Sequence, residues 1–290
     1  MSAASAVRAV SWLRPRGPRG PGSALLVTGA VLLALVVLAA AAAPWLAPFD
    51  PAAQQVGPVL QPPGGDHLLG TDRFGRDVLS RVLHGGRTTL LATALVMVVV
   101  LAVGTAVGAL MASAPRWADA LARRVVDLLV AFPVVVVALA FVGLRGPSFA
   151  TVLTGVLLVL WAPFARLTRA LVRAALAEPS ATTARALGAR RGRLLRLEVW
   201  PRLRGPLLVL AAVESAQLIS VVAGLSFLGV GAQPPSAEWG AMLQEGRAPL
   251  FSAPHLVLAP GLAVLATVFG LVCLAEGLRD RTDARTGVLA

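Results

Sequence analysis

The chain of 290 residues is too apolar for a soluble protein: 57% of its residues are hydrophobic, 14% are charged and the mean hydropathy is +0.78. Its net charge of +12 comes from 26 basic residues, all of them Arg, against 14 acidic ones. Because the chain has no Lys, it lacks the lysine of a phosphate-binding P-loop and the amine of Schiff-base catalysis. The composition predicts a lipid-embedded protein that neither binds ATP in the usual way nor performs lysine chemistry.

The residues that usually build metal and hydrolase sites are few. Cys273 is the only cysteine and lies in an apolar run, so an internal disulfide is excluded and a buried packing role is expected. His67, His84 and His255 are scattered, and the sequence contains no HExxH, no GxSxG and no paired Cys. We therefore expect no metal, no cofactor and no catalytic residue.

Six long apolar segments are each suited to cross about 30 Å of hydrocarbon, which takes roughly 20 residues. They predict an all-α membrane protein with six transmembrane helices, at 24–46, 88–114, 125–144, 149–165, 206–230 and 255–275. The third segment contains Pro133, which predicts a kinked span, and has Asp127 near its start. The first segment is longer than the apolar core of a secretory signal and five spans follow it, so we interpret it as a retained helix.

The arginines predict the orientation. With a cytoplasmic N-terminus, 20 of the 26 lie on the inner side, and ten of these fall in one loop, 166–204. This positive-inside bias predicts that the tails 1–23 and 278–290 are both cytoplasmic. The basic surplus is then a topology signal, and we expect no nucleic acid as a partner.

The longest external connection, 47–87, ends in the block HLLGTDRFGRDVLSRVLHGGR. Apolar residues recur there at helical spacing, which predicts a short amphipathic helix at the outer membrane interface. We expect Thr71 or Asp72 to cap it and Gly85 and Gly86 to end it. An alternative is that this segment receives a partner protein through its charged residues Asp72, Arg73, Arg76 and Asp77.

The inner loop 166–204 predicts a helical hairpin. Ser180 is placed to cap a short helix over 181–187, Gly188 to provide a left-handed turn, and a second helix then runs to Pro201. An apolar face of the second helix is expected to pack on the membrane domain through Leu194, Leu195, Leu197 and Trp200. That packing leaves the first helix free to dock elsewhere, although a basic helix beside a membrane is also typical of a topology anchor.

Two features within the spans point to contacts. Glu214 lies about nine residues into the fifth span, where a carboxylate costs roughly 2.5 kcal/mol or more. We expect it to face a translocation path or another subunit, or to form a hydrogen bond between packed helices. Gly104, Gly108 and Ala112 form a small-xxx-small strip on the second span, which favours close helix packing inside the chain or between subunits.

Several blocks carry a resemblance to a known family. They are LGTDRFGRDVLSRVLHGGR from Leu69, VVDLLVAFP from Val125, ARALGA from Ala184, LSFLGVGAQPPSAEWGAMLQEGR from Leu225 and GLRD from Gly277. Together they resemble the inner-membrane permease of binding-protein-dependent ABC importers, specifically the C-type subunit of the dipeptide, oligopeptide and nickel group. The resemblance covers most of the chain from about residue 45.

The resemblance implies a type I ABC importer permease fold, with a core over 88–277 and a cytoplasmic coupling-helix hairpin. It implies a homologous second permease, two ATP-binding cassette ATPase subunits and an extracytoplasmic substrate-binding protein as partners. The chain would form half of a translocation path for peptides or related small solutes, and ATP hydrolysis would occur in the partners. The ATPase-coupling residues implied are Ala181, Thr182, Thr183, Ala184, Arg185, Ala186, Leu187, Gly188, Ala189 and Pro201.

The chain departs from the family pattern at two places. Thr182 and Thr183 replace the Glu and the first Ala of the coupling motif, so a negative charge is missing there. Val222 stands where many relatives carry a Glu, and Glu214 does not substitute for it because the two lie about 80° apart around a helix.

Two other function classes stay open from the residues alone. An ATP-independent secondary transporter or channel is disfavoured by the lack of an inverted-repeat pattern and by the single clearly embedded carboxylate. In a scaffold without transport activity, the hairpin would serve only as an anchor.

Overall fold

The computed structural model describes residues 21–189 and 191–286, and their regular structure is entirely helical. This confirms the all-α prediction. The expected N-terminal tail up to residue 20, with its four arginines, lies outside the described residues, as do Arg190 and residues 287–290 of the second tail.

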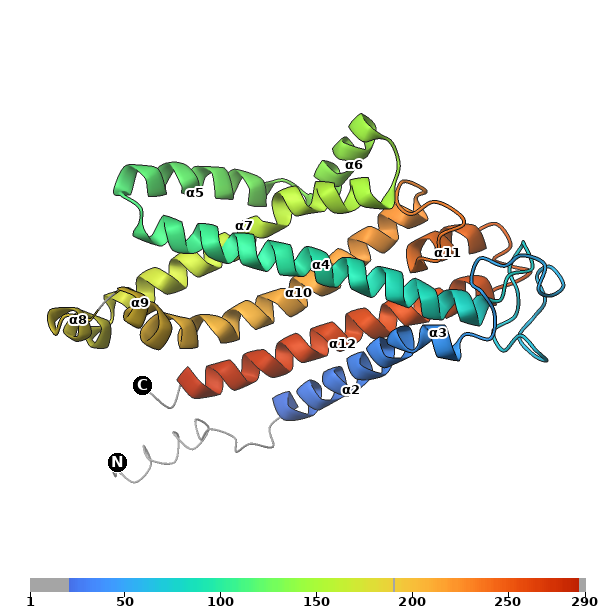
Figure 1. Cartoon of the computed structure of the whole chain (residues 1–290), viewed down its shortest axis with the longest axis horizontal. Coiled ribbons are helices and arrows are strands. Elements are labelled where there is room, and N and C mark those ends of the chain that lie inside the picture. The colour runs from blue at the N-terminus through green and yellow to red at the C-terminus, as the bar shows by residue number, and fades with distance from the viewer. Residues whose placement is uncertain (1–20, 190, 287–290) are drawn as a thin grey trace, which may run out of the picture.

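Among the described residues, five helices are long and apolar enough to cross a membrane. They are α2 (Pro21–Ala41), α4 (Val78–Ser113), α7 (Phe149–Ala177), α10 (Trp200–Phe227) and α12 (His255–Thr286). All five follow the long axis of the molecule (Figure 1). The short helices α8 (Pro179–Ala186) and α9 (Arg191–Leu194) lie at one end, which we call the hairpin end; α12 also ends there. The opposite end, which we call the loop end, contains the loop 47–77, α3 (Ala43–Leu46) and α11 (Trp239–Gly246).

The third predicted span is broken rather than kinked. Helices α5 (Arg116–Ala131) and α6 (Val134–Arg145) meet at an angle of 84°, and the bundle has six spans if this bent pair is one of them. Proline restrains the preceding residue to extended backbone, and Phe132 has φ −81° and ψ 129°. Pro133 therefore ends α5 outright.

Small residues bring the spans close together. A Cβ atom on Gly29 of α2 would lie 2.5 Å from the backbone nitrogen of Leu274 in α12. On α4, a Cβ on Gly104 would lie 2.5 Å from the Cβ of Phe164, and one on Gly108 would lie 2.5 Å from the carbonyl oxygen of Ala165. The small-residue strip of α4 thus packs inside the chain, against α7.

Both predicted ends of the interfacial helix before the second span are wrong. Asp77 is the N-cap of α4: its carboxylate accepts a hydrogen bond from the backbone N–H of Ser80 at 2.8 Å. The helix then continues without interruption through Gly85 and Gly86 to Ser113. Glycine tolerates a helix interior, and here the missing side chains admit a neighbouring aromatic ring, as described below.

The predicted hairpin exists, but its boundaries differ. Glu178 rather than Ser180 precedes α8, because its carbonyl accepts the first helical hydrogen bond, from Thr182 at 3.0 Å, and Pro179 takes the first helical position. After α9, a π-helical turn (Leu195–Val199) leads directly into α10. Pro201 therefore does not end a helix; it lies in the first turn of the fifth span, where its missing N–H is tolerated.

Candidate functional site

The turn of the hairpin is built around Gly188. Its φ of +81° is the left-handed conformation that glycine adopts at little cost, and the Ala189 N–H donates back to the Ala184 carbonyl at 2.9 Å. This six-to-one hydrogen bond is the mark of a Schellman motif. The left-handed turn predicted at Gly188 is confirmed.

Ion pairs fasten the hairpin to the spans on both sides of it. Arg202, in the first turn of α10, contacts Glu198 of the π-turn at 3.1 Å and Glu178 at the end of α7 at 3.4 Å. The Ser180 hydroxyl of α8 also donates to Glu198, at 3.0 Å. The three segments around the turn are therefore linked to one another. Each contact is partly exposed, so the set acts as a network rather than as one strong bond.

The outer surface of α8 is free within the chain. Only Ala181 is fully buried, whereas Thr182, Thr183 and Ala186 are exposed, as is Leu187 beyond the helix. The Thr182 hydroxyl donates to the Glu178 carbonyl at 3.1 Å, so its hydrogen bond is made within the first turn of α8. The side chain of Arg185 lies outside the described residues.

The expected apolar face of the second hairpin helix is mostly absent. Leu194 is buried, but Leu195, Leu197 and Trp200 are each about half exposed. The π-turn adds a residue to the helical repeat and moves the side chains around the axis, and Val199 is buried instead. A hollow of about 880 Å³ lies between Leu194 and Leu195 and the spans α4 and α7; it is lined by Ala106, Ala109, Leu110, Ser113, Val172, Leu176, Ala189, Leu194 and Leu195.

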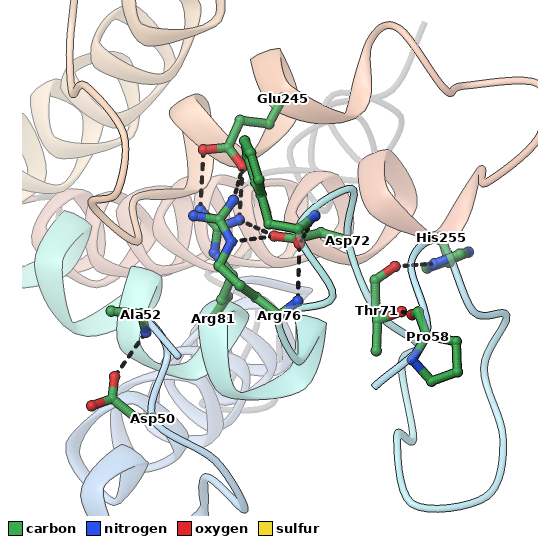
Figure 2. A network of polar contacts seen from close by, with 10 residues as sticks. Asp50, Ala52, Pro58, Thr71, Asp72, Arg76, Arg81, Glu245 and His255 are labelled. Carbon is green, nitrogen blue, oxygen red and sulfur yellow. Dashed lines mark hydrogen bonds and ion pairs between the residues drawn. The ribbon is translucent and has the colours of Figure 1, made fainter. Parts of the chain in front are cut away.

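At the loop end, four charged side chains form a buried cluster (Figure 2). Arg81 contacts Asp72 at 2.5 Å and Glu245 of α11 at 2.7 Å, and Arg76 contacts Asp72 at 2.6 Å and also Glu245. All four residues are at most 5% exposed. Two cations and two anions balance, as a buried charge cluster requires.

Asp72 also organises the turn in which it lies. Its carboxylate accepts hydrogen bonds from the backbone N–H of Phe74 at 2.8 Å and of Arg76 at 3.0 Å. Burial raises the pKa of Asp72, but these backbone hydrogen bonds and the charges of Arg76 and Arg81 outweigh it, so the pKa is below the ordinary 3.8. The idea that Asp72, Arg76 and Asp77 receive a partner protein is wrong, because all three are buried, whereas Arg73 is exposed.

The start of α11 also packs against the first turns of α4. Glu238 caps α11 by accepting from the backbone N–H groups of Gly240 and Ala241, both at 2.9 Å. The next residue, Trp239, donates from its indole Nε1 to the Val82 carbonyl at 2.9 Å, and its ring lies against Gly85 and Gly86 of α4. Local sequence signals miss the contact of Trp239 with Val82 because it joins segments 157 residues apart.

Glu214 lies half-buried in the middle of α10. In the described part of the chain, no hydrogen bond or ion pair contacts it, so the helix-packing hydrogen bond considered from the sequence is not formed. Nearby, Val213, Gln217, Ser220 and Gly224 recur at helical spacing and are all exposed. Val222, in contrast, is buried in the core.

No group of three or more His, Cys, Asp or Glu side chains suited to a metal ion occurs among residues 21–189 and 191–286. Cys273 is buried, as expected.

Comparison with known proteins identifies the family. Residues 104–288 match the family described as binding-protein-dependent transport system inner membrane component, and residues 24–63 match the N-terminal TM domain of oligopeptide transport permease C. The chain belongs to this permease family. It is the membrane-spanning permease subunit of an ABC importer, not a catalytic subunit. The family match therefore disfavours the alternative hypothesis of an ATP-independent transporter or channel.

Curated relatives cover nearly the whole permease. The Di/tripeptide transport system permease protein DppC of Pseudomonas aeruginosa is 37% identical over 263 residues, which cover 89% of this chain and 87% of that protein. The Dipeptide transport system permease proteins DppC of Escherichia coli K12 and of Alkalihalophilus pseudofirmus are 38% and 34% identical, covering 89% and 90% of this chain and 88% and 86% of those proteins. The permease is therefore a multi-pass inner-membrane protein similar to these over most of its length.

Proposed function

We propose that this permease imports peptides and that the hairpin of α8 and α9 receives the force of ATP hydrolysis from separate ATPase subunits. The hairpin end is then cytoplasmic, with both termini on that side, as the arginine distribution favours. A homologous second permease completes the translocation path, two ATP-binding cassette subunits dock at the hairpin end, and an external binding protein delivers substrate at the loop end.

The observation that carries the coupling proposal is that the exposed helix α8 is linked by ion pairs to the spans on both sides of it. Thr182 and Thr183 of α8 are exposed, and so is Leu187 just after it, while Arg202 links the start of the helix to α7 and α10. Such a connection transmits a push on α8 to two spans as a rigid body. The hollow of about 880 Å³ beside the hairpin leaves room for that displacement relative to α4.

Peptides are the proposed substrate class because the relatives are named as dipeptide and di/tripeptide transport permeases. The lack of a cluster for a metal ion among the described residues argues only against the binding of a bare metal ion by this subunit. We place Glu214 in the path together with the exposed face of Gln217, Ser220 and Gly224, because polar groups exposed within a span favour a water-filled route over lipid.

Cysteine cross-linking tests the docking of α8. In a Cys273→Ala background, Thr182→Cys and Thr183→Cys are each expected to form cross-links to the ATPase subunits in the purified complex. Leu68→Cys, which is also exposed but lies at the loop end, is the matched control and should form none. Cross-links from Leu68→Cys alone, or co-purification of no ATPase, would overturn the proposal.

A further inference from the structure

The three sides of α5 have different surroundings. Trp117, Leu121 and Val125 follow one another at helical spacing and are all exposed apolar residues. Val126 is buried toward the core. A third side carries Arg123 and Asp127, four residues apart and both exposed. A helix with an exposed apolar side and an exposed charged side separates two media.

The charged side of α5 continues onto α7. Arg166 of α7 contacts Asp127 at 2.6 Å, although these side chains are 52% and 63% exposed. Buried Asp119 of α5 contacts Arg169 and Arg173 of α7 and Arg123 of its own helix. We call this group the polar seam: Asp119, Arg123, Asp127, Arg166, Arg169 and Arg173.

The polar seam has a surplus of positive charge. It contains four guanidinium groups and two carboxylates, and three of the arginines are exposed. Asp127 lies within an apolar segment, about one turn before the break at Phe132 and Pro133. Charged side chains facing hydrocarbon there would cost roughly 2.5 kcal/mol or more each, so this side of α5 is expected to face water while the Trp117 side faces lipid.

We propose that the polar seam lines the aqueous translocation path in its hairpin-end half and attracts the carboxylate of the passing solute. The Asp127–Arg166 pair is its accessible element, because a solute carboxylate can exchange with Asp127 on the Arg166 guanidinium. This assignment rests on the proposed function for the identity of the solute, but the exposure of the seam to water does not.

Thiol labelling of two positions on α5 tests the exposure to water. Asp127 is exposed on the charged side, whereas Val125 lies on the apolar side, about 160° away around the helix. Helix α5 runs from the hairpin end inward (Figure 1), so at 1.5 Å per residue Asp127 lies about 3 Å farther from that end along the helix than Val125. Access from the hairpin end alone would therefore label Val125 first.

The measurement uses the permease complex in nanodiscs, with Cys273→Ala as background and a charged, water-soluble thiol reagent. We expect Asp127→Cys to react about tenfold faster than Val125→Cys. Equal rates, or faster labelling of Val125→Cys, would overturn the proposal by showing that lipid or a protein partner covers the seam. This outcome does not depend on whether peptides are transported.

Uptake measurements test the attraction of a carboxylate. Arg166→Gln is expected to lower uptake of a dipeptide about threefold more than uptake of its C-terminal amide, and Arg166→Lys should restore part of the difference. Arg124→Gln, an exposed arginine outside the seam, is the control and should change neither. Equal loss for both solutes in Arg166→Gln would contradict carboxylate recognition. No uptake of either solute by the wild type would instead count against the proposed function.

Discussion

The guanidinium of Arg81 donates to the carboxylate of Glu245 at 2.7 Å, although 164 residues separate the two in the chain. Arg81 lies in the first turn of α4 and Glu245 in the last turn of α11, so this contact joins the span α4 to the connection between the spans α10 and α12. With Asp72 and Arg76, it fixes the loop end as one packed cap (Figure 2).

Breaking the buried cluster should destabilise the cap. Glu245→Ala leaves Arg76 and Arg81 with one anion between them, which is expected to lower the free energy of unfolding by about 3 kcal/mol. Equilibrium unfolding in mixed micelles measures this change. Arg247→Ala, two residues away and exposed, is the matched control and should shift stability by at most about 0.5 kcal/mol. Equal effects of the two substitutions would contradict the role of the cluster.

The glycines of α4 should be needed for packing rather than for flexibility. A Cβ on Gly86 would lie 2.7 Å from Cζ2 of Trp239, whose ring is held by its hydrogen bond to Val82. Gly86→Ala is therefore expected to cost about 1–3 kcal/mol. Gly143→Ala, in α6 with open space around the new Cβ, should instead stabilise the protein by about 0.5 kcal/mol. Thermal unfolding of both variants checks the sign, and stabilisation by Gly86→Ala would refute this packing.

The pKa of Asp72 predicts a dependence of stability on pH. Since its pKa in the folded protein is below the ordinary 3.8, the stabilisation by Asp72 is complete above that value and is lost as pH falls through the lowered pKa. Asp72→Asn should therefore be less stable than the wild type at pH 7, and the difference should shrink in strong acid. Unfolding curves at a series of pH values test this, and a difference that grows on acidification would be the wrong sign.

Gly188 should be required for its backbone conformation. Open space surrounds a Cβ built there, so a larger residue would not clash, but φ +81° is unfavourable for most side chains by about 1–2 kcal/mol. Gly188→Arg is expected to distort the turn and uncouple ATP hydrolysis from uptake, while Gly188→Asn, which tolerates this conformation, should retain most coupling. The ratio of solute imported to ATP hydrolysed, measured with the complex intact, distinguishes them. Normal coupling in Gly188→Arg would count heavily against the hairpin as the coupling element.

Local signals in the sequence predicted the elements that depend on local physics. Apolar length located the spans, and glycine chemistry located the turn at Gly188. Pro133 marked the place of the break in the third span, but not its 84° angle, because packing of α6 on α7 sets that direction.

The errors arose where distant segments decide the outcome. Gly85 and Gly86 resemble a helix end, and only the ring of Trp239 explains why α4 continues through them. The charges of Asp72 and Arg76 resemble a surface patch, and only Glu245 of α11 allows their burial. No local pattern in the sequence contains either contact.

ATP-dependent uptake in proteoliposomes tests the central claim most directly. The permease would be reconstituted with its sister permease, the ATPase subunits and the binding protein, and import of a labelled dipeptide followed with and without ATP. We predict import that requires ATP and this permease and that falls to background in Gly188→Arg, although the complex still assembles. Dipeptide import that proceeds equally without ATP, or that is unchanged in Gly188→Arg, would contradict the account.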